Sequence, residues 1–192
     1  FGNKYPNAGY GGMFRNWLLQ DSPEPYGSWA NGSAMRVSPC AWVADSLEEA
    51  QELAKTSAAV THNHPEGIKG ALATVDAIYL ARIGASKDEI RNHVELRYDY
   101  DLSSSVDEIR PSYKFDVSCR GSVPESIVCF LDAKDFEDTI RNAVSLGGDA
   151  DTQAAIAGSI ASAYWDVSKN IAFKSIHRLD YRLLKVFIDF EE

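Results

Sequence analysis

Apolar residues recur every three or four positions along most of this chain, which is the spacing of one face of an α-helix. We expect helices over residues 13–19, 46–59, 66–83, 86–97, 124–131, 135–146, 151–164 and 176–187. No stretch alternates apolar and polar residues for the length of a strand. The pattern therefore predicts an all-α fold.

Start signals mark three of these helices. Ser46 with Glu49, and Ser86 with Glu89, have the spacing of a capping box, in which a hydroxyl and a carboxylate satisfy backbone N–H groups at the helix start. Pro124 is expected near the first position of its helix, where its missing N–H costs nothing.

Loop-forming residues gather in two parts of the chain. Residues 8–12 and 26–33 are rich in Gly, Ser and Asn, which favours loops. Residues 98–117 are polar and contain Pro111, so we expect a long loop there with one short helical turn.

The composition indicates the number of domains, the kinds of partner and the compartment that we expect. A chain of 192 residues with 45% hydrophobic residues can bury one core, so we expect a single domain over residues 1–192. The net charge of −9 argues against nucleic acid as a partner, and no apolar run approaches the roughly 20 residues of a membrane span. The three cysteines have no metal-binding spacing, which favours free thiols and a cytoplasmic protein.

One candidate site lies at the turn Gly147-Gly148-Asp149-Ala150-Asp151-Thr152. Asp149, Asp151 and Thr152 offer two carboxylates and a hydroxyl within four residues, and such oxygen ligands suit Mg²⁺ or Mn²⁺. An ordinary helix start with an Asp cap explains the same residues. The spacing alone leaves both interpretations open.

Two further segments offer ligand-binding groups. Residues 27–33 can present backbone N–H groups and hydroxyls to a phosphate, and Trp29 can stack on a ring or anchor the loop. His62 and His64 are two positions apart, so they cannot share a helical face as a zinc pair. Taken alone, the pair is better explained by histidines that satisfy backbone groups at a helix junction.

Taken in order, residues 5–11, 31–36, 61–67 and 147–152 resemble the ADP-ribosylglycohydrolase family. The resemblance extends from Tyr5 to about Trp165. The family includes dinitrogenase-reductase-activating glycohydrolases and animal ADP-ribosylarginine and ADP-ribosylserine hydrolases. It implies a compact, orthogonal helical domain with a site for two Mg²⁺ or Mn²⁺ ions.

The resemblance also assigns residues. It implies Asp149, Asp151 and Thr152 as metal ligands. It implies a substrate site made by Gly27, Ser28, Trp29, Asn31, Gly32, Ser33 and His62, with His62 along a bound ADP-ribose. His64 is expected to support its turn, and Arg36 to be an ion-pair partner. No catalytic residue is assigned.

The chain departs from the family pattern in one respect. In the family, a Thr-Asp-Asp run supplies the other metal ligands, and this chain contains no such run. We expect a domain that lacks its N-terminal part. The missing half of the metal site then lies on a preceding segment, lies on a second chain, or is absent.

The implied function is metal-dependent hydrolysis of the glycosidic bond between ADP-ribose and a protein side chain, or of a related small ADP-ribosylated substrate. Two alternatives remain: an inactive module that binds ADP-ribose or another nucleotide, and a structural protein similar to the lens crystallins of the family. The target, whether arginine, serine, a base or a metabolite, stays open.

Overall fold

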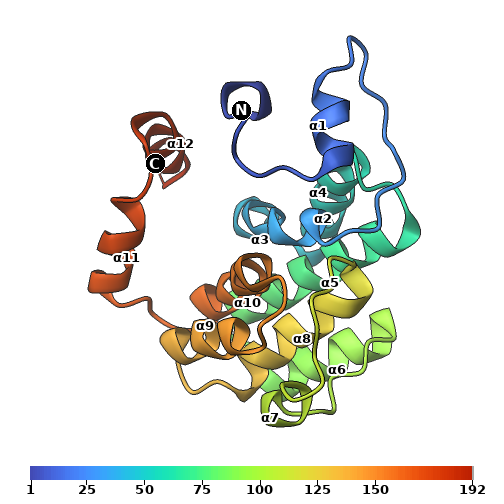
Figure 1. Ribbon diagram of the computed structural model, residues 1–192. Helices are drawn as coiled ribbons and strands as arrows, with labels where there is room; N and C mark the ends of the chain where they lie inside the picture. The colour runs from blue at the N-terminus through green and yellow to red at the C-terminus, as the bar shows by residue number, and fades with distance from the viewer. Residues whose placement is uncertain (192) are drawn as a thin grey trace.

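Helices account for the regular structure of this protein. The computed structural model describes residues 1–191, which contain twelve α-helices, a short 3₁₀ helix (Gly2–Lys4) and no β-strand (Figure 1). The α-helices are α1 (Gly12–Leu18), α2 (Gly32–Met35), α3 (Ser38–Val43), α4 (Leu47–Ala59), α5 (Pro65–Arg82), α6 (Lys87–Tyr98), α7 (Val106–Ile109), α8 (Cys119–Asp132), α9 (Phe136–Ser145), α10 (Ala150–Tyr164), α11 (Lys169–Ile176) and α12 (Tyr181–Glu191). The all-α prediction is confirmed.

The central element is α5, which packs against α2, α3, α4, α6, α8 and α10 (Figure 1). Its residues are buried on almost every side, and a helix that is apolar all round belongs in a core. At its first turns, Gly67 and Gly70 leave room for neighbours: a side chain would meet the Ser28 carbonyl oxygen at Gly67 and the Cys119 thiol at Gly70. The start of α5 is therefore the place where other segments approach most closely.

The predicted caps are present. The hydroxyls of Ser46 and Ser86 accept the N–H groups of Glu49 and Glu89, 3.1 and 3.3 Å away. Glu89 completes the capping box at Ser86, whereas the Glu49 carboxylate accepts the N–H of Asp45 instead. The short helical turn expected within residues 98–117 is α7.

The expectation for Pro124 is wrong, because Pro124 lies inside α8. The Ser118 hydroxyl accepts the N–H of Gly121 at 2.9 Å, which starts the helix at Cys119. Proline lacks the N–H that would reach back four residues, so α8 loses one backbone bond at that point. The Ser118 cap escaped the prediction because no Glu or Gln follows it at the capping-box spacing.

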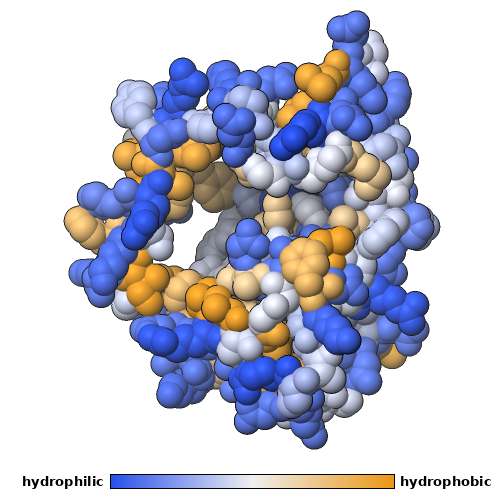
Figure 2. Space-filling model, in the orientation of Figure 1, coloured by the Kyte–Doolittle hydropathy of each residue, from blue (hydrophilic) through white to orange (hydrophobic). Residues whose placement is uncertain are grey.

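The C-terminal helix predicted over residues 176–187 is two helices. A second helix, α12, starts after Asp180, because the Asp180 carboxylate accepts the N–H groups of Arg182 and Leu183. Together α11 and α12 form an arm that stands away from the other helices, and Figure 2 shows an opening beside it. The Tyr5 hydroxyl links the N-terminal segment to this arm by donating to Asp180 at 2.7 Å. Five apolar side chains of α12 are exposed: Leu183, Val186, Phe187, Ile188 and Phe190.

Neither a disulfide nor a membrane-spanning helix is present within residues 1–191. All three cysteines are free thiols, as expected, and Cys119 and Cys129 are buried. Between residues 1 and 191, no helix has both the length and the apolar character needed to cross a bilayer.

A polar network fixes α5 to α4 and α6. Asp76, with 0% exposure, lies in the middle of α5. Its carboxylate accepts the Gln51 amide at 2.8 Å, the His93 Nε2 at 2.7 Å and the Tyr98 hydroxyl at 2.5 Å. Arg97 Nε lies 3.8 Å away. Because one acid satisfies groups from both neighbouring helices, its loss leaves the buried Tyr98 hydroxyl and the half-buried Gln51 and His93 without this partner.

We expect Asp76→Ala to lower the free energy of unfolding by about 3 kcal/mol or more, as breaking a buried ionic network does. Urea denaturation measures this. The control is Asp107→Ala, because the Asp107 side chain is 88% exposed in a surface pair with Arg110 and its loss costs at most about 0.5 kcal/mol. A cost below about 1 kcal/mol for Asp76→Ala would contradict the anchoring role.

Candidate functional site

The predicted 27–33 loop lies across the starts of α5 and α8. The Asn31 N–H donates to the Val117 carbonyl at 2.8 Å, and the Cys119 N–H donates to the Trp29 carbonyl at 3.0 Å. The Ser33 hydroxyl donates to the Gly67 carbonyl at 2.7 Å. These bonds hold the loop from both sides. Its last two residues, Gly32 and Ser33, lie in α2 and not in a loop as expected.

The 27–33 loop also reaches the predicted metal motif. The Asn31 side-chain amide donates to Asp149 Oδ2 at 2.8 Å and to the Ser122 hydroxyl at 3.1 Å. Asn31 and Asp149 are 118 positions apart in the sequence. The fold therefore brings together two segments that the sequence analysis proposed separately.

The start of α10 is not an ordinary Asp cap. Asp149 occupies the cap position, but its side chain accepts no N–H group of the helix. Its carboxylate is directed to Asn31 instead. Asp151 is exposed, and its Oδ1 accepts the N–H of Thr152 at 3.0 Å. The capping interpretation is therefore wrong for Asp149, whose orientation is set by another segment.

Asp149, Asp151 and Thr152 carry oxygen donors of the kind that Mg²⁺ or Mn²⁺ prefers. The second oxygen of Asp149 is not needed for the bond to Asn31. Within residues 1–191, no three His, Cys, Asp or Glu side chains are grouped so that they could hold a metal ion. The described residues thus offer oxygen donors but not a complete set of ligands for a metal ion.

His62 is 6% exposed and lies between Thr61 and Gly32. Its Nδ1 is 2.7 Å from the Thr61 hydroxyl, and a side chain at Gly32 would come within 3.1 Å of its Nε2. Burial, reinforced by the nearby Arg36 charge, lowers the pKa of His62 to about 4. The imidazole is therefore neutral at pH 7.

Arg36 is exposed and forms no ion pair with any residue between 1 and 191, contrary to the expectation. Its guanidinium donates to the Gly32 carbonyl at 3.0 Å, the Ser57 carbonyl at 2.9 Å and the Thr61 hydroxyl at 3.0 Å. Backbone oxygens take the place of an acid because α2 and the end of α4 both direct carbonyls toward it. Arg36 thus joins α2 to the segment that carries His62.

The remaining predicted residues are placed as follows. His64 supports its turn as expected, since its Nδ1 accepts the N–H of Glu66 at 3.1 Å at the start of α5. The Gly27 N–H donates to the Asn63 side chain at 2.7 Å. Trp29 is 47% exposed, so its ring is not simply an anchor in the core.

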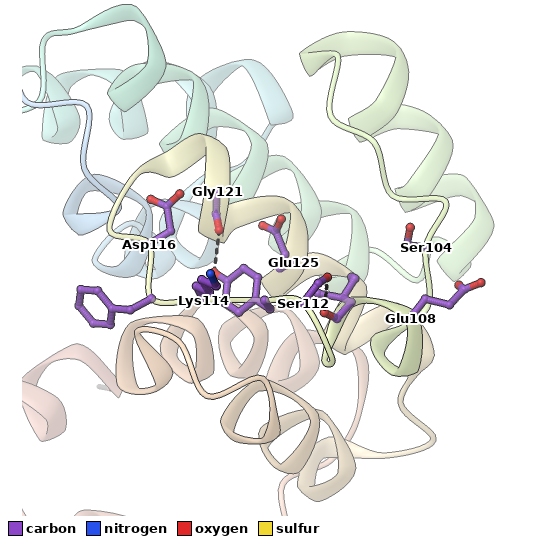
Figure 3. A pocket seen from close by; sticks show the side chains of 10 residues that line it. Ser104, Glu108, Ser112, Lys114, Asp116, Gly121 and Glu125 are labelled. Atoms are coloured by element: carbon purple, nitrogen blue, oxygen red, sulfur yellow. Dashed lines mark hydrogen bonds between the residues drawn. The ribbon is translucent and has the colours of Figure 1, made fainter.

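A cavity of about 470 Å³ lies beside the start of α8, and the sequence analysis did not predict it (Figure 3). It is lined by Ser104, Glu108, Ile109, Ser112, Tyr113, Lys114, Phe115, Asp116, Gly121 and Glu125. One oxygen of Glu125 is buried and accepts no hydrogen bond from residues 1–191, and burial raises the pKa of Glu125. The available signal was an acid placed shortly before the apolar run of residues 127–131 in α8. Tyr113 connects the cavity to α10, because its hydroxyl accepts the Gln153 amide at 3.1 Å.

The lowered pKa of His62 gives a pH-dependent stability. Between the unfolded pKa of 6.5 and the folded value of about 4, the unfolded chain binds a proton that the native state does not. We expect stability to fall as the pH falls through this window, by at most about 3 kcal/mol. His62→Gln should remove this part of the slope in urea denaturation series from pH 7 to 4. His177→Gln, at an exposed histidine, is the control; parallel curves for His62→Gln and the unmodified chain would refute the assignment.

Comparison with known proteins connects this geometry to a family. The model of the ADP-ribosylglycohydrolase family matches residues 3–188. ADP-ribosylhydrolase ARH3 of Mus musculus is 30% identical over 226 residues, covering 86% of this chain and 61% of that protein. The corresponding Homo sapiens protein is 28% identical, with 86% and 62% covered. ADP-ribosylarginine hydrolase Tri1 of Pseudomonas putida is 28% identical over 173 residues, covering 87% of this chain and 46% of that protein.

A solved structure shares the fold. The chain described as "ADP-ribosylglycohydrolase-related protein complex" aligns with a TM-score of 0.62 at 24% identity, covering 80% of this chain and 56% of that one. This chain spans about three fifths of the length of the animal relatives it matches.

Proposed function

Since this chain belongs to the ADP-ribosylglycohydrolase family, a family of glycosidic-bond hydrolases, we propose that it binds ADP-ribose between the 27–33 loop and the start of α10. There it takes part in hydrolysis of the bond between ADP-ribose and a modified protein side chain or a related small substrate. The observation that supports this best is the hydrogen bond from Asn31 to Asp149, because it unites the candidate ligand-binding loop with the candidate metal ligands.

The diphosphate of ADP-ribose has suitable donors in this region. The N–H groups of Ser28 and Asn31 already donate to backbone carbonyls. Those of Gly32 and Ser33 donate to no group within residues 1–191, so they are available to phosphate oxygens. Trp29, with almost half of its surface exposed, offers a ring on which the adenine can stack.

Asp149, Asp151 and Thr152 would hold Mg²⁺ or Mn²⁺, and we place the completing ligands on a further polypeptide segment. When bound, such an ion supplies positive charge where negative charge develops as the glycosidic bond breaks. Asn31 holds the Asp149 carboxylate in one orientation for this purpose. A carboxylate that does not cap its own helix is free to serve a ligand.

We expect Asn31→Ala to weaken ADP-ribose binding about tenfold, the effect of losing a hydrogen bond to a charged group. Isothermal titration calorimetry with ADP-ribose, with and without Mg²⁺, measures this. Asp149→Asn should abolish any increase in affinity caused by Mg²⁺, because a neutral amide is a poor ligand for that ion. Asp107→Asn, at an exposed acid in α7, should change neither value.

Turnover is a separate measurement. Peptides ADP-ribosylated on arginine or on serine are incubated with the chain and Mg²⁺ or Mn²⁺, and released ADP-ribose is quantified. Release that is lost in Asp149→Asn supports hydrolysis by this chain. Tight ADP-ribose binding without release, and without an effect of Mg²⁺, would instead support a binding module. Absence of binding at millimolar ADP-ribose would reject the proposed site.

A further inference from the structure

Three side chains form a continuous hydrogen-bonded series behind the 27–33 loop. Arg36 Nη2 is 3.0 Å from the Thr61 hydroxyl oxygen, and this oxygen is 2.7 Å from His62 Nδ1. Arg36 is itself fixed by the carbonyls of Gly32 and Ser57. The series begins at the permanent positive charge of Arg36 and ends at the imidazole of His62, which carries its proton on either Nδ1 or Nε2.

The donors and acceptors determine that nitrogen. A guanidinium only donates, so the Thr61 oxygen accepts from Arg36. The Thr61 hydroxyl has a single proton. Two side chains beside it can accept that proton, the His62 imidazole and the Tyr26 phenol, and the short distance of 2.7 Å to His62 Nδ1 favours the imidazole. Nδ1 therefore accepts, and in a neutral imidazole the proton lies on Nε2.

The surroundings keep the ring neutral. The ring is buried, and Arg36 places a positive charge behind it, so both effects disfavour the imidazolium. The other titratable neighbour is Tyr26, whose ring centroid is 6.2 Å away. Burial raises the pKa of Tyr26, which keeps its phenol neutral at pH 7. No carboxylate from residues 1–191 is within ion-pair distance of His62.

The opposite nitrogen faces the candidate ligand site. His62 Nε2 lies against Gly32, whose own N–H is among the groups available to a phosphate. Nε2 donates to no protein group within residues 1–191, yet it is not among the polar atoms that are completely shut off from solvent. A ligand held by the 27–33 loop can therefore accept the hydrogen bond that His62 Nε2 does not give to the protein.

We propose that Arg36 and Thr61 are positioning residues that hold His62 as a neutral Nε2–H donor directed at an oxygen of ADP-ribose. The proposal rests on the proposed function for the identity of the ligand, whereas the tautomer belongs to the free protein. Thr61 sets the tautomer, and Arg36 orients Thr61 so that its proton is directed to Nδ1.

The test is two-dimensional ¹H–¹⁵N NMR of the imidazole nitrogens in the ligand-free chain at pH 7. We expect His62 to show a protonated Nε2 and an unprotonated Nδ1. Thr61→Ser keeps the hydroxyl and should keep this pattern, whereas Thr61→Val, of nearly the same shape, should give a mixture of tautomers. Arg36→Met should also give a mixture. A protonated Nδ1 as the main form, or an imidazolium, in the unmodified chain would overturn the proposal.

Binding of ADP-ribose is measured on the same variants by calorimetry. We expect Thr61→Val to weaken binding about tenfold and Thr61→Ser to stay within about twofold, since one correctly oriented hydrogen bond corresponds to roughly that factor. Unchanged affinity in Thr61→Val, with a changed tautomer, would overturn the role of the series in recognition. If no variant and not even the unmodified chain binds ADP-ribose, the proposed function fails while the NMR result still decides the tautomer.

Discussion

The 27–33 loop can lie on the start of α5 because Gly67 has no side chain. A Cβ atom there would be 2.5 Å from the Ser28 carbonyl oxygen, well inside van der Waals contact. The Ser33 hydroxyl confirms this close approach by donating to the Gly67 carbonyl. From this contact the loop continues to Asn31, which reaches Asp149, and to Gly32, which lies against His62. Both halves of the candidate site therefore depend on a single point of backbone packing.

The contact between the 27–33 loop and Gly67 is only as rigid as α5 itself. The helix is buried almost throughout, and the Asp76 network holds its middle to α4 and α6. Ligand groups mounted on such a helix keep their geometry better than groups on a mobile loop. The 27–33 loop gains similar rigidity from its bonds to residues 117–119. The candidate site is therefore held by contacts within the protein, and such preorganisation reduces the entropy cost of binding a ligand.

The long helices could be predicted from sequence because each one is periodic over several turns, as in α4, α5 and α6. The four-residue α2 could not, since it is shorter than one repeat of the pattern and is held by tertiary bonds. In the site, motif resemblance was enough to select Asn31, His62 and Asp149 as candidates. Their mutual arrangement was not predictable, because the bond from Asn31 to Asp149 joins residues 118 positions apart. Arg36 was misjudged for a different reason: two of its three partners are backbone carbonyls, which no sequence pattern singles out.

Charge explains why this kind of site suits an acidic protein. A chain of net charge −9 would have to bind an anion against its own overall field, so the attraction has to be local. Backbone N–H groups and a neutral imidazole provide directed hydrogen bonds, and they avoid the desolvation cost of burying an unpaired charge. Arg36 contributes its charge from one hydrogen bond farther back, where carbonyl oxygens already satisfy it. In the proposed site, recognition of the anion then depends on the orientation of neutral donors, and we assign to Thr61 the role of setting that orientation for His62.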